Sequence, residues 1–428
     1  MTSLSVQTER GAGERAGPRD RRPVFALLSA NAISLSGNAL TSLAIPWFVL
    51  ATTGSASKTG LVAFTQMLPT VLAAFLGGAL VDRIGPKQMS VFADLASGIT
   101  VGLVPLLYHT VGLAFWQLLI LVFLGAVLDT PGNTAREALL PELVQRAGTS
   151  LERANGIMQT IQSSSSLVGP VLAGLLITHL GASNVLWVDA ATFAVSALLI
   201  GLMVPRLPRP VQQRGRYRDE VLDGLRFLRQ DRLVLTIIVM AAILNFVGPP
   251  TFTVVMPVFA RQEFGSAQSL GVILAGFGAG SLLGGAAFSI LGARLPRRMT
   301  TIALLGVSSV AIAGMAWLPA VAIATLLTGV FGFAVGSVNP MIYTLLQERA
   351  PAEFRGRIFG TVLGIALLAA PAGMLVAGAS VQAFGVRAVF LAVAVVQAAV
   401  TLATLLQPVL KEMDRPQFAA PAGDHGGA

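Results

Sequence analysis

Three aspartates lie inside apolar stretches of the chain that are long enough to cross a membrane. They are Asp94, Asp129 and Asp189. A carboxylate in the hydrocarbon region of a bilayer is costly, and it is kept there to bind an ion, carry a proton or pair with a cation. We therefore treat each of the three as a candidate for proton coupling.

The depth of each aspartate leaves two interpretations open. Asp129 lies about six residues from one end of its stretch, where it either takes up a proton or forms an ion pair with Arg83 or Lys87. Asp94 lies at a similar depth and either supports the same ion-pair network or takes up a proton. Asp189 lies near the opposite membrane face, where it either makes a polar contact at a helix end or takes up a proton. The predicted spans contain no Lys or Arg.

The elements that must position these residues are twelve apolar spans. Of the residues, 54% are hydrophobic and only 11% are charged, and each span is long enough for a helix to cross a bilayer. Continuous apolar runs favour helices over a barrel, whose strands alternate in polarity. We predict spans at 24–51, 59–81, 88–108, 113–135, 154–180, 184–204, 233–259, 268–291, 299–318, 320–345, 358–383 and 386–408.

Basic residues gather on one side of these spans. Of the 29 Lys and Arg residues, all but Lys58, Arg261 and Arg387 fall in the tails or in alternate loops. Cytoplasmic loops retain Lys and Arg, so we expect a multi-pass protein of the bacterial inner membrane with both termini in the cytoplasm. Residues 1–23 are predicted to be a disordered tail that leads into an uncleaved first helix.

The net charge of +9 does not indicate nucleic-acid binding, because the basic residues are scattered over short loops beside membrane ends. The absence of cysteine excludes disulfides, iron–sulfur clusters and thiolate metal sites. His109 and His179 are isolated, so we predict no metal site and no enzymatic activity.

The chain repeats itself around a long polar interruption. Gly77-Gly78 corresponds to Gly284-Gly285, Pro131 to Pro340, and Pro170 to Pro371. The fold prediction is therefore an all-α membrane protein with twelve transmembrane helices in two six-helix parallel pseudo-repeats, at 24–204 and 233–408. Residues 205–232 are predicted to link them through an amphipathic surface helix or an ordinary solvated linker, and residues 409–428 to form a cytoplasmic tail.

The segment GGALVDRIGPKQ (77–88) resembles the loop between the second and third helices of the major facilitator superfamily. The resemblance implies a gating role for Gly78, Asp82, Arg83, Gly85 and Lys87, which would hold the cytoplasmic side closed in one state. Pro86 stands where that family usually has a basic residue, so this chain lacks one of the charges that hold the cytoplasmic side closed in the family.

Two further resemblances narrow the family. GPVLAG (169–174) is similar to the fifth-helix motif of drug exporters, in which Gly169, Pro170 and Gly174 would bend and pack the helix. The loops 140–156 and 347–360 resemble those of the third drug:H⁺ antiporter family, and the chain is similar to actinobacterial Tap-like multidrug efflux pumps. Many members of this antiporter family carry an acid in the first helix, where this chain has Gly37-Asn38.

Uncharged polar and aromatic residues in the predicted spans indicate a largely apolar cavity with a few hydrogen-bonding points. Alternatively, the polar residues bond neighbouring helices to one another. The candidates are Asn38, Gln66, Asn245, Phe246, Phe333, Asn339 and Tyr343, with Asn31 and Trp47 nearby. Gly248-Pro249-Pro250 is predicted to interrupt helix hydrogen bonds, which makes Pro249 and Pro250 candidates for a gating bend.

The leading functional prediction is efflux of amphipathic drugs or secondary metabolites, driven by the proton gradient without a cofactor. Its partners would be a small-molecule substrate, protons and membrane lipids, and we expect a monomer. Three alternatives stay open: an importer or facilitator, a siderophore-type exporter of one native metabolite, and a membrane sensor or scaffold that does not transport.

Overall fold

The computed structural model describes residues 20–206, 231–292, 294–349 and 355–414, with the backbone alone at 73–80, 82 and 355–363. The predicted amphipathic linker helix and most of both tails lie outside these residues. The regular secondary structure within the described ranges is entirely helical, as the long apolar runs predict.

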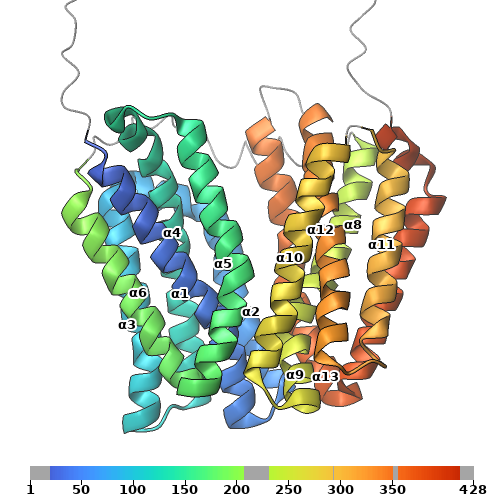
Figure 1. Ribbon diagram of the computed structural model, residues 1–428, viewed down its shortest axis with the longest axis horizontal. Helices are drawn as coiled ribbons and strands as arrows, with labels where there is room; N and C mark the ends of the chain where they lie inside the picture. Colours follow the sequence, from blue (N-terminus) through green and yellow to red (C-terminus); the bar gives the residue numbers. More distant parts are fainter. Residues whose placement is uncertain (1–19, 207–230, 293, 350–354, 415–428) are drawn as a thin grey trace, which may run out of the picture.

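The N-terminal bundle consists of six helices (Figure 1). Serines cap two of them, since the side chains of Ser55 and Ser150 accept hydrogen bonds from the backbone N–H groups of Lys58 and Arg153. The helices are α1 (Arg22–Thr53), α2 (Ala56–Ile84), α3 (Pro86–Thr110), α4 (Phe115–Ala147), α5 (Leu151–Leu180) and α6 (Ala182–Met203).

The C-terminal bundle lies beside it and contains the remaining helices (Figure 1). Asp231 caps its first helix by accepting hydrogen bonds from the N–H groups of Leu233 and Val234. The elements are α8 (Arg232–Pro250), η1 (Thr251–Val255), α9 (Met256–Phe264), α10 (Ala267–Leu291), α11 (Arg297–Gly314), α12 (Val321–Arg349), α13 (Arg355–Leu406) and η2 (Pro408–Asp414).

Several predicted boundaries were wrong. Helix α4 continues to Ala147, about three turns beyond the predicted end at 135, because its second half is amphipathic and packs against α1. The predicted break between the spans 358–383 and 386–408 is present, since α13 consists of two helices that meet at Gly385. Gly385 has a φ of 81°, a backbone conformation that glycine adopts without steric cost. Part of the predicted C-terminal tail forms η2.

The proline pair in α8 is followed directly by a π-helical turn. Proline has no backbone N–H, so Pro249 and Pro250 remove two donors from the helix ladder. The chain then forms the π-helix η1, and the hydroxyls of Thr251 and Thr253 donate to the carbonyl oxygens of Val247 and Pro249. The predicted interruption therefore coincides with a local widening of the helix, a feature that is often found at functional sites.

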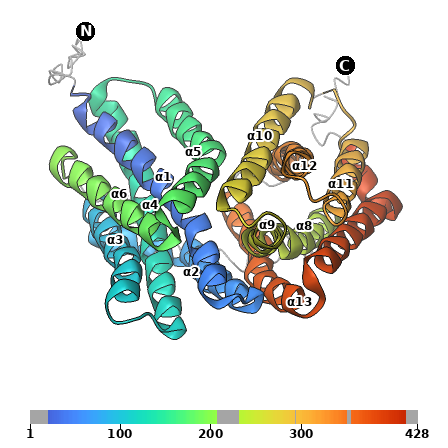
Figure 2. The ribbon, with the colours of Figure 1, turned by 60° about the horizontal axis from the view of Figure 1, so that its bottom comes forward.

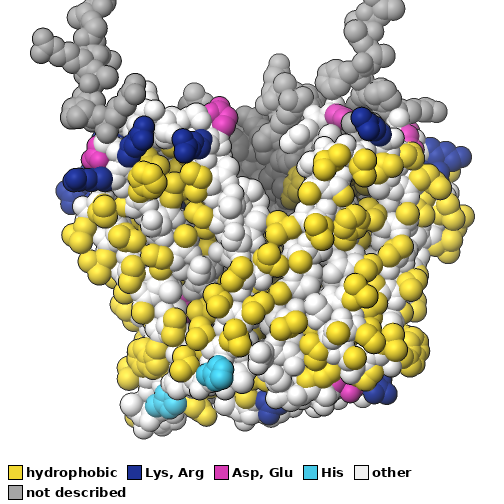
Figure 3. All heavy atoms as spheres, in the orientation of Figure 1, with side chains coloured by type: hydrophobic (Ala, Val, Ile, Leu, Met, Phe, Trp, Pro, Cys, Tyr) yellow, Lys and Arg dark blue, Asp and Glu magenta, His cyan; other side chains and the backbone are white. Residues whose placement is uncertain are grey.

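The described helices expose many large hydrophobic side chains. Among the described residues, nine helical segments are long and apolar enough to cross a membrane. In Figure 3, hydrophobic side chains cover the middle of the visible face, while most Lys and Arg lie at the end from which both tails leave. We call this the terminal end and the opposite one the distal end. The chain is a multi-pass membrane protein.

The two bundles touch through the helix pairs α2–α13 and α5–α10 (Figure 2). A Cβ at Gly60 on α2 would lie 2.5 Å from the carbonyl oxygen of Met374 on α13, and one at Gly174 on α5 would lie 2.6 Å from that of Ala267 on α10. Only glycine permits this backbone approach. Gly60, Gly174 and Ala267 lie near the distal ends of their helices, so these tight contacts join the bundles at the distal end.

The C-terminal segment η2 is fastened to the terminal end of the C-terminal bundle. Arg349 at the end of α12 pairs with Asp231 (3.3 Å) and with Glu412 of η2 (3.2 Å). Leu410 and Met413 of η2 are buried against α8 and α12. Three separate parts of the chain thus meet at one guanidinium.

Candidate functional site

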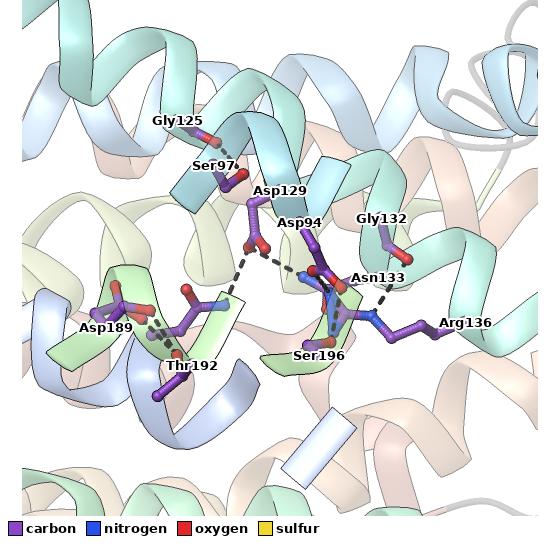
Figure 4. A network of polar contacts seen from close by, with 11 residues as sticks. Asp94, Ser97, Gly125, Asp129, Gly132, Asn133, Arg136, Asp189, Thr192 and Ser196 are labelled. Carbon is purple, nitrogen blue, oxygen red and sulfur yellow. Dashed lines mark hydrogen bonds and ion pairs between the residues drawn. The ribbon is translucent and has the colours of Figure 1, made fainter. Parts of the chain in front are cut away.

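The charged core of the N-terminal bundle contains an ion pair that joins α3 to α4 (Figure 4). Nη2 of Arg136 lies 2.9 Å from Oδ1 of Asp94, and both side chains are completely shielded from solvent. Ser196 of α6 donates its hydroxyl to the other oxygen of Asp94 at 2.7 Å. Gly132 allows the two helices to approach, because a Cβ there would lie 2.7 Å from that of Ala93.

This pair bears on two predictions. The sequence analysis placed no Lys or Arg inside the membrane, but Arg136 is wholly buried in the helix bundle because α4 continues past residue 135. Asp94 was expected either to support the loop network at Arg83 and Lys87 or to take up a proton. Its partners are Arg136 and Ser196 and not Arg83 or Lys87, which makes it the counter-charge of a buried cation, while proton uptake by Asp94 stays a prediction.

Asp129 lies seven residues before Arg136 on α4, so the two side chains fall on similar faces of the helix two turns apart. Its Oδ2 accepts hydrogen bonds from the amide of Asn38 on α1 (3.2 Å) and from that of Asn133 (3.1 Å) (Figure 4). Its Oδ1 is buried and has no hydrogen-bond partner among the described residues. The carboxylate is thus held by two neutral amides, with one oxygen left over.

The predicted ion pair between Asp129 and Arg83 or Lys87 is not formed. Lys87 instead donates to the carbonyl oxygen of Gly201 near the end of α6, at 2.8 Å. Arg83 is exposed at the end of α2. The ammonium group of Lys87 therefore satisfies a helix C-terminus, where a positive charge is favourable.

Asp189 is fully buried on α6, about two turns from the distal end of this helix. Thr41 of α1 donates a hydrogen bond to one of its oxygens, and Thr192 donates to the other (Figure 4 shows Thr192). A Cβ at Gly37 on α1 would overlap this carboxylate and Thr192. Gly37 therefore makes room in the first helix for an acid that comes from α6. Among the described residues, neither Asp129 nor Asp189 forms an ion pair.

Asp129 and Asp189 line a common cavity of about 260 Å³ within the N-terminal bundle. Asn38 and Gln66, both selected from the sequence, also line it. Its other polar groups are hydroxyls, and its apolar walls come from α1, α3, α4 and α6. These further residues are Thr41, Ser42, Ile45, Thr70, Ser97, Thr100, Val101, Val104, Leu121, Val122, Gly125, Ala126, Leu186 and Phe193.

A larger cavity of about 660 Å³ lies between α1, α4 and α5. The sequence analysis noted only Asn31 among its lining residues. It missed Glu137, Asn155, Gln159 and Gln162, although the last three recur at the spacing that places residues on one helix face. The full lining is Asn31, Leu35, Asn133, Glu137, Leu140, Asn155, Met158, Gln159 and Gln162.

The gating motif is only partly described. Only the backbone is described at Gly78 and Asp82, so the contacts predicted for them stay predictions. Gly85 separates α2 from α3 with a φ of 96°, which explains the need for glycine at this position. The backbone therefore changes direction where the motif predicts a loop.

The predicted cavity residues of the C-terminal bundle lie on α8 and α12. Asn245 on α8 donates to the carbonyl oxygen of Ala241 in its own helix at 2.9 Å, so this bond does not join two helices as the alternative expected. The backbone of Phe246 packs against Gly373. The other three candidates belong to α12 and are exposed, namely Phe333, Asn339 and Tyr343.

The fifth-helix motif lies at two helix contacts. A Cβ at Gly169 would lie 2.5 Å from that of Ala39 on α1, and Gly174 packs against α10. The carbonyl oxygen of Pro170 meets Gly271 of α10. The residues expected to bend and pack α5 therefore lie where this helix touches α1 and the other bundle.

Comparisons with known proteins agree with this architecture. A model of the family described as Major Facilitator Superfamily matches residues 27–366 and, in a second match, 251–423. The multidrug efflux pump Tap of Mycobacterium tuberculosis is 32% identical over 404 residues, which cover 92% of this chain and 96% of Tap.

Two more distant proteins are also similar. Macrolide efflux protein A of Streptococcus pyogenes is 24% identical over 373 residues, covering 86% of this chain and 91% of that protein. The crystal structure of the nucleoside transporter NupG superposes with a TM-score of 0.75 at 13% identity, covering 90% of this chain and 98% of NupG. That likeness shows the fold. The chain therefore belongs to the Major Facilitator Superfamily of membrane transporters.

Proposed function

We propose that the chain exports amphipathic drugs or secondary metabolites by alternating access, in exchange for protons. The observation that carries the proposal is Asp129, a carboxylate of the N-terminal bundle that two neutral amides hold beside a cavity. Its Oδ1 has no partner among the described side chains, so this oxygen is available for a proton.

The contrast between the three buried aspartates supports this assignment. Asp94 has Arg136 as its counter-charge and therefore has no need of a proton. Asp129 and Asp189 have no ion-pair partner in the described part of the chain. Burying a carboxylate without a counter-charge is strongly unfavourable, and binding a proton removes that cost. We infer that Asp129 binds the coupling proton, with Asp189 as a second candidate in the same cavity.

The contacts between the bundles support alternating access. Backbone approaches at Gly60 and Gly174 hold the distal ends of the bundles together. In the proposed cycle, these contacts break when the transporter opens on the distal side. The residues of the gating motif, Gly78, Asp82, Arg83, Gly85 and Lys87, would then contribute to closure at the terminal end.

The relatives support export over import. Tap and macrolide efflux protein A are both described as efflux proteins, and Tap aligns with almost the whole chain. The concentration of Lys and Arg at the terminal end supports a cytoplasmic location for both termini. Substrate would therefore enter from the cytoplasm and leave at the distal end, and the expected working unit is a monomer in the bacterial inner membrane.

Accumulation of tetracycline and of ethidium in cells with and without the chain tests the proposal. Lower accumulation that a protonophore abolishes is the expected result. Higher accumulation would instead identify an importer. Unchanged accumulation across these compounds and a panel of metabolites, at normal protein level, would favour a sensor or scaffold.

A further inference from the structure

Carboxamides are the commonest side chains that line the 660 Å³ cavity. Five Asn and Gln side chains reach it from three helices, and Glu137 adds one carboxylate. The carboxamides belong to Asn31 of α1, Asn133 of α4, and Asn155, Gln159 and Gln162 of α5. Because hydrogen-bonding groups are rare inside membrane helices, a cluster of this size calls for a polar occupant.

Three of the five carboxamides donate a hydrogen bond to another group of the protein. The amide nitrogen of Asn133 donates to Asp129 at 3.1 Å, that of Asn31 to the sulfur of Met158 at 3.4 Å, and that of Gln159 to Ser163 at 3.5 Å. A carboxamide has one acceptor oxygen besides its N–H donors. Each of these three residues therefore keeps its carbonyl oxygen and one N–H for a ligand, so the cavity wall can both accept and donate hydrogen bonds.

Glu137 gives this wall a negative charge. Its side chain is exposed and has neither an ion pair nor a hydrogen bond among the described residues. The neighbouring Arg136 does not neutralise it, since that guanidinium is buried against Asp94 on another face of α4. A wall of carboxamides with one free carboxylate is complementary to a cation that also carries hydroxyl groups, since a hydroxyl both donates to carbonyl oxygens and accepts from N–H groups.

The cavity lies on the terminal side of the contact between the bundles. Gly278 of α10 packs against Ser166 and Leu167 of α5, and Asn155, Gln159 and Gln162 lie closer to the terminal end of α5. A molecule that enters from the terminal end therefore meets the carboxamide wall before it reaches this closure.

We propose that this cavity binds the polar, ammonium-bearing part of the substrate. Glu137 pairs with the ammonium group, and the oxygens of Asn31, Asn133 and Gln159 accept hydrogen bonds from neighbouring hydroxyl groups. The assignment of this ligand to a transported substrate rests on the proposed function. The proposed contacts narrow the substrate class from amphipathic compounds in general to hydroxyl-bearing amines.

Three small probes with the same carbon skeleton test the proposal. N-methyl-D-glucamine carries an amine and five hydroxyls, sorbitol lacks the amine, and N-methylhexylamine lacks the hydroxyls. Binding to the full chain in lipid nanodiscs is measured by saturation-transfer NMR, with empty nanodiscs subtracted. We expect N-methyl-D-glucamine to bind about tenfold more tightly than either of the other two, since each lacks one set of contacts.

Substitutions identify the binding wall. Glu137→Gln should weaken N-methyl-D-glucamine about tenfold, to the level of sorbitol, because it removes the charge-assisted contact. Gln159→Leu should weaken it severalfold. Glu152→Gln, at an exposed acid in the first turn of α5 outside the cavity, is the matched control and should change nothing.

The proposal is wrong if the three probes bind the wild type equally or not at all. It is also wrong if Glu137→Gln and Glu152→Gln behave alike. A variant that fails to fold is recognised by size-exclusion chromatography, and the comparison of the three probes on the wild type still decides. Energy-dependent drug export without N-methyl-D-glucamine binding would refute the cavity assignment alone, whereas Glu137-dependent binding without export would refute the transport proposal alone.

Discussion

Arg136 and Asp94 form an ion pair of 2.9 Å between α4 and α3, and no part of either side chain is accessible to solvent. Removing one member leaves the other as an uncompensated buried charge, which typically costs about 3–5 kcal/mol. We therefore expect Arg136→Gln to lower the midpoint of thermal unfolding of the detergent-purified protein strongly.

The double variant Asp94→Asn with Arg136→Gln should recover much of this loss, because neither side chain is then charged. Fluorescence-detected size-exclusion chromatography after heating measures all the variants together. A double variant that is less stable than both single variants would show that the pair is not the main interaction of these residues.

Asp129→Asn should abolish uphill export and leave the fold intact. The asparagine oxygen can still accept hydrogen bonds from Asn38 and Asn133, but the side chain no longer binds and releases a proton. We expect pH-gradient-driven drug transport in proteoliposomes to fall at least about tenfold, because the variant lacks the ionisable group that carries the proton.

Downhill exchange of drug should persist in the same Asp129→Asn proteoliposomes, which separates coupling from substrate binding. Asp20→Asn, at an exposed acid before α1, is the control. Normal uphill transport by Asp129→Asn would remove this residue from the coupling mechanism and leave Asp189 as the candidate.

Gly60→Ala should prevent full closure at the distal end. The new Cβ would lie 2.5 Å from the carbonyl oxygen of Met374, so the α2 and α13 backbones must separate. Because the chain has no cysteine, Ala63→Cys provides a single reporter at a position that is 3% exposed beside Val254 and Met374. We expect maleimide to label this reporter severalfold faster with Gly60→Ala, at a stability cost of about 1–3 kcal/mol.

Gly156→Ala provides the matched control for this experiment. No heavy atom lies within 4 Å of a Cβ at this position of α5, so the labelling rate should not change. Alanine inside a helix should instead stabilise the protein by about 0.5–1 kcal/mol. Equal labelling rates with Gly60→Ala and Gly156→Ala would mean that the glycine contact does not control the distal opening.

The orientation in the membrane is testable with two further single cysteines. Thr110→Cys places an exposed thiol at the distal end, and Gln145→Cys places one near the terminal end of α4. With cytoplasmic termini, a membrane-impermeant maleimide should label Thr110→Cys in spheroplasts and Gln145→Cys only after permeabilisation. The reverse pattern would invert the proposed orientation and the direction of transport.

The sequence predicted the helical membrane architecture well, because apolar length and charge asymmetry are local properties of a chain. The glycines and prolines at α5 and α8 were also identified, since these residue types have strong backbone effects. The predicted end of α4 was wrong because an apolar pattern stops where a helix leaves lipid, while hydrogen bonding continues the helix to Ala147.

The partners of the aspartates were not predictable from one sequence. Asp94 meets Arg136 across 42 positions, and Asp189 meets Thr41 across 148. Such pairs depend on how helices rotate against one another, which apolar periodicity does not specify. The carboxamides of α5 were predictable from their helical spacing, which places them on one face of the helix, but only charged groups were selected there.

During synthesis, α3 reaches the membrane before α4, so Asp94 arrives without its counter-charge. The translocon meets an acidic helix first and a helix containing Arg136 immediately afterwards. Because the two helices are consecutive and antiparallel, they can enter the bilayer as a hairpin in which Asp94 and Arg136 already compensate each other, before the later helices exist. The ion pair then acts on biogenesis as well as on the finished protein, and a defect in Arg136 would lower the yield of inserted protein before any folded transporter is available to lose activity.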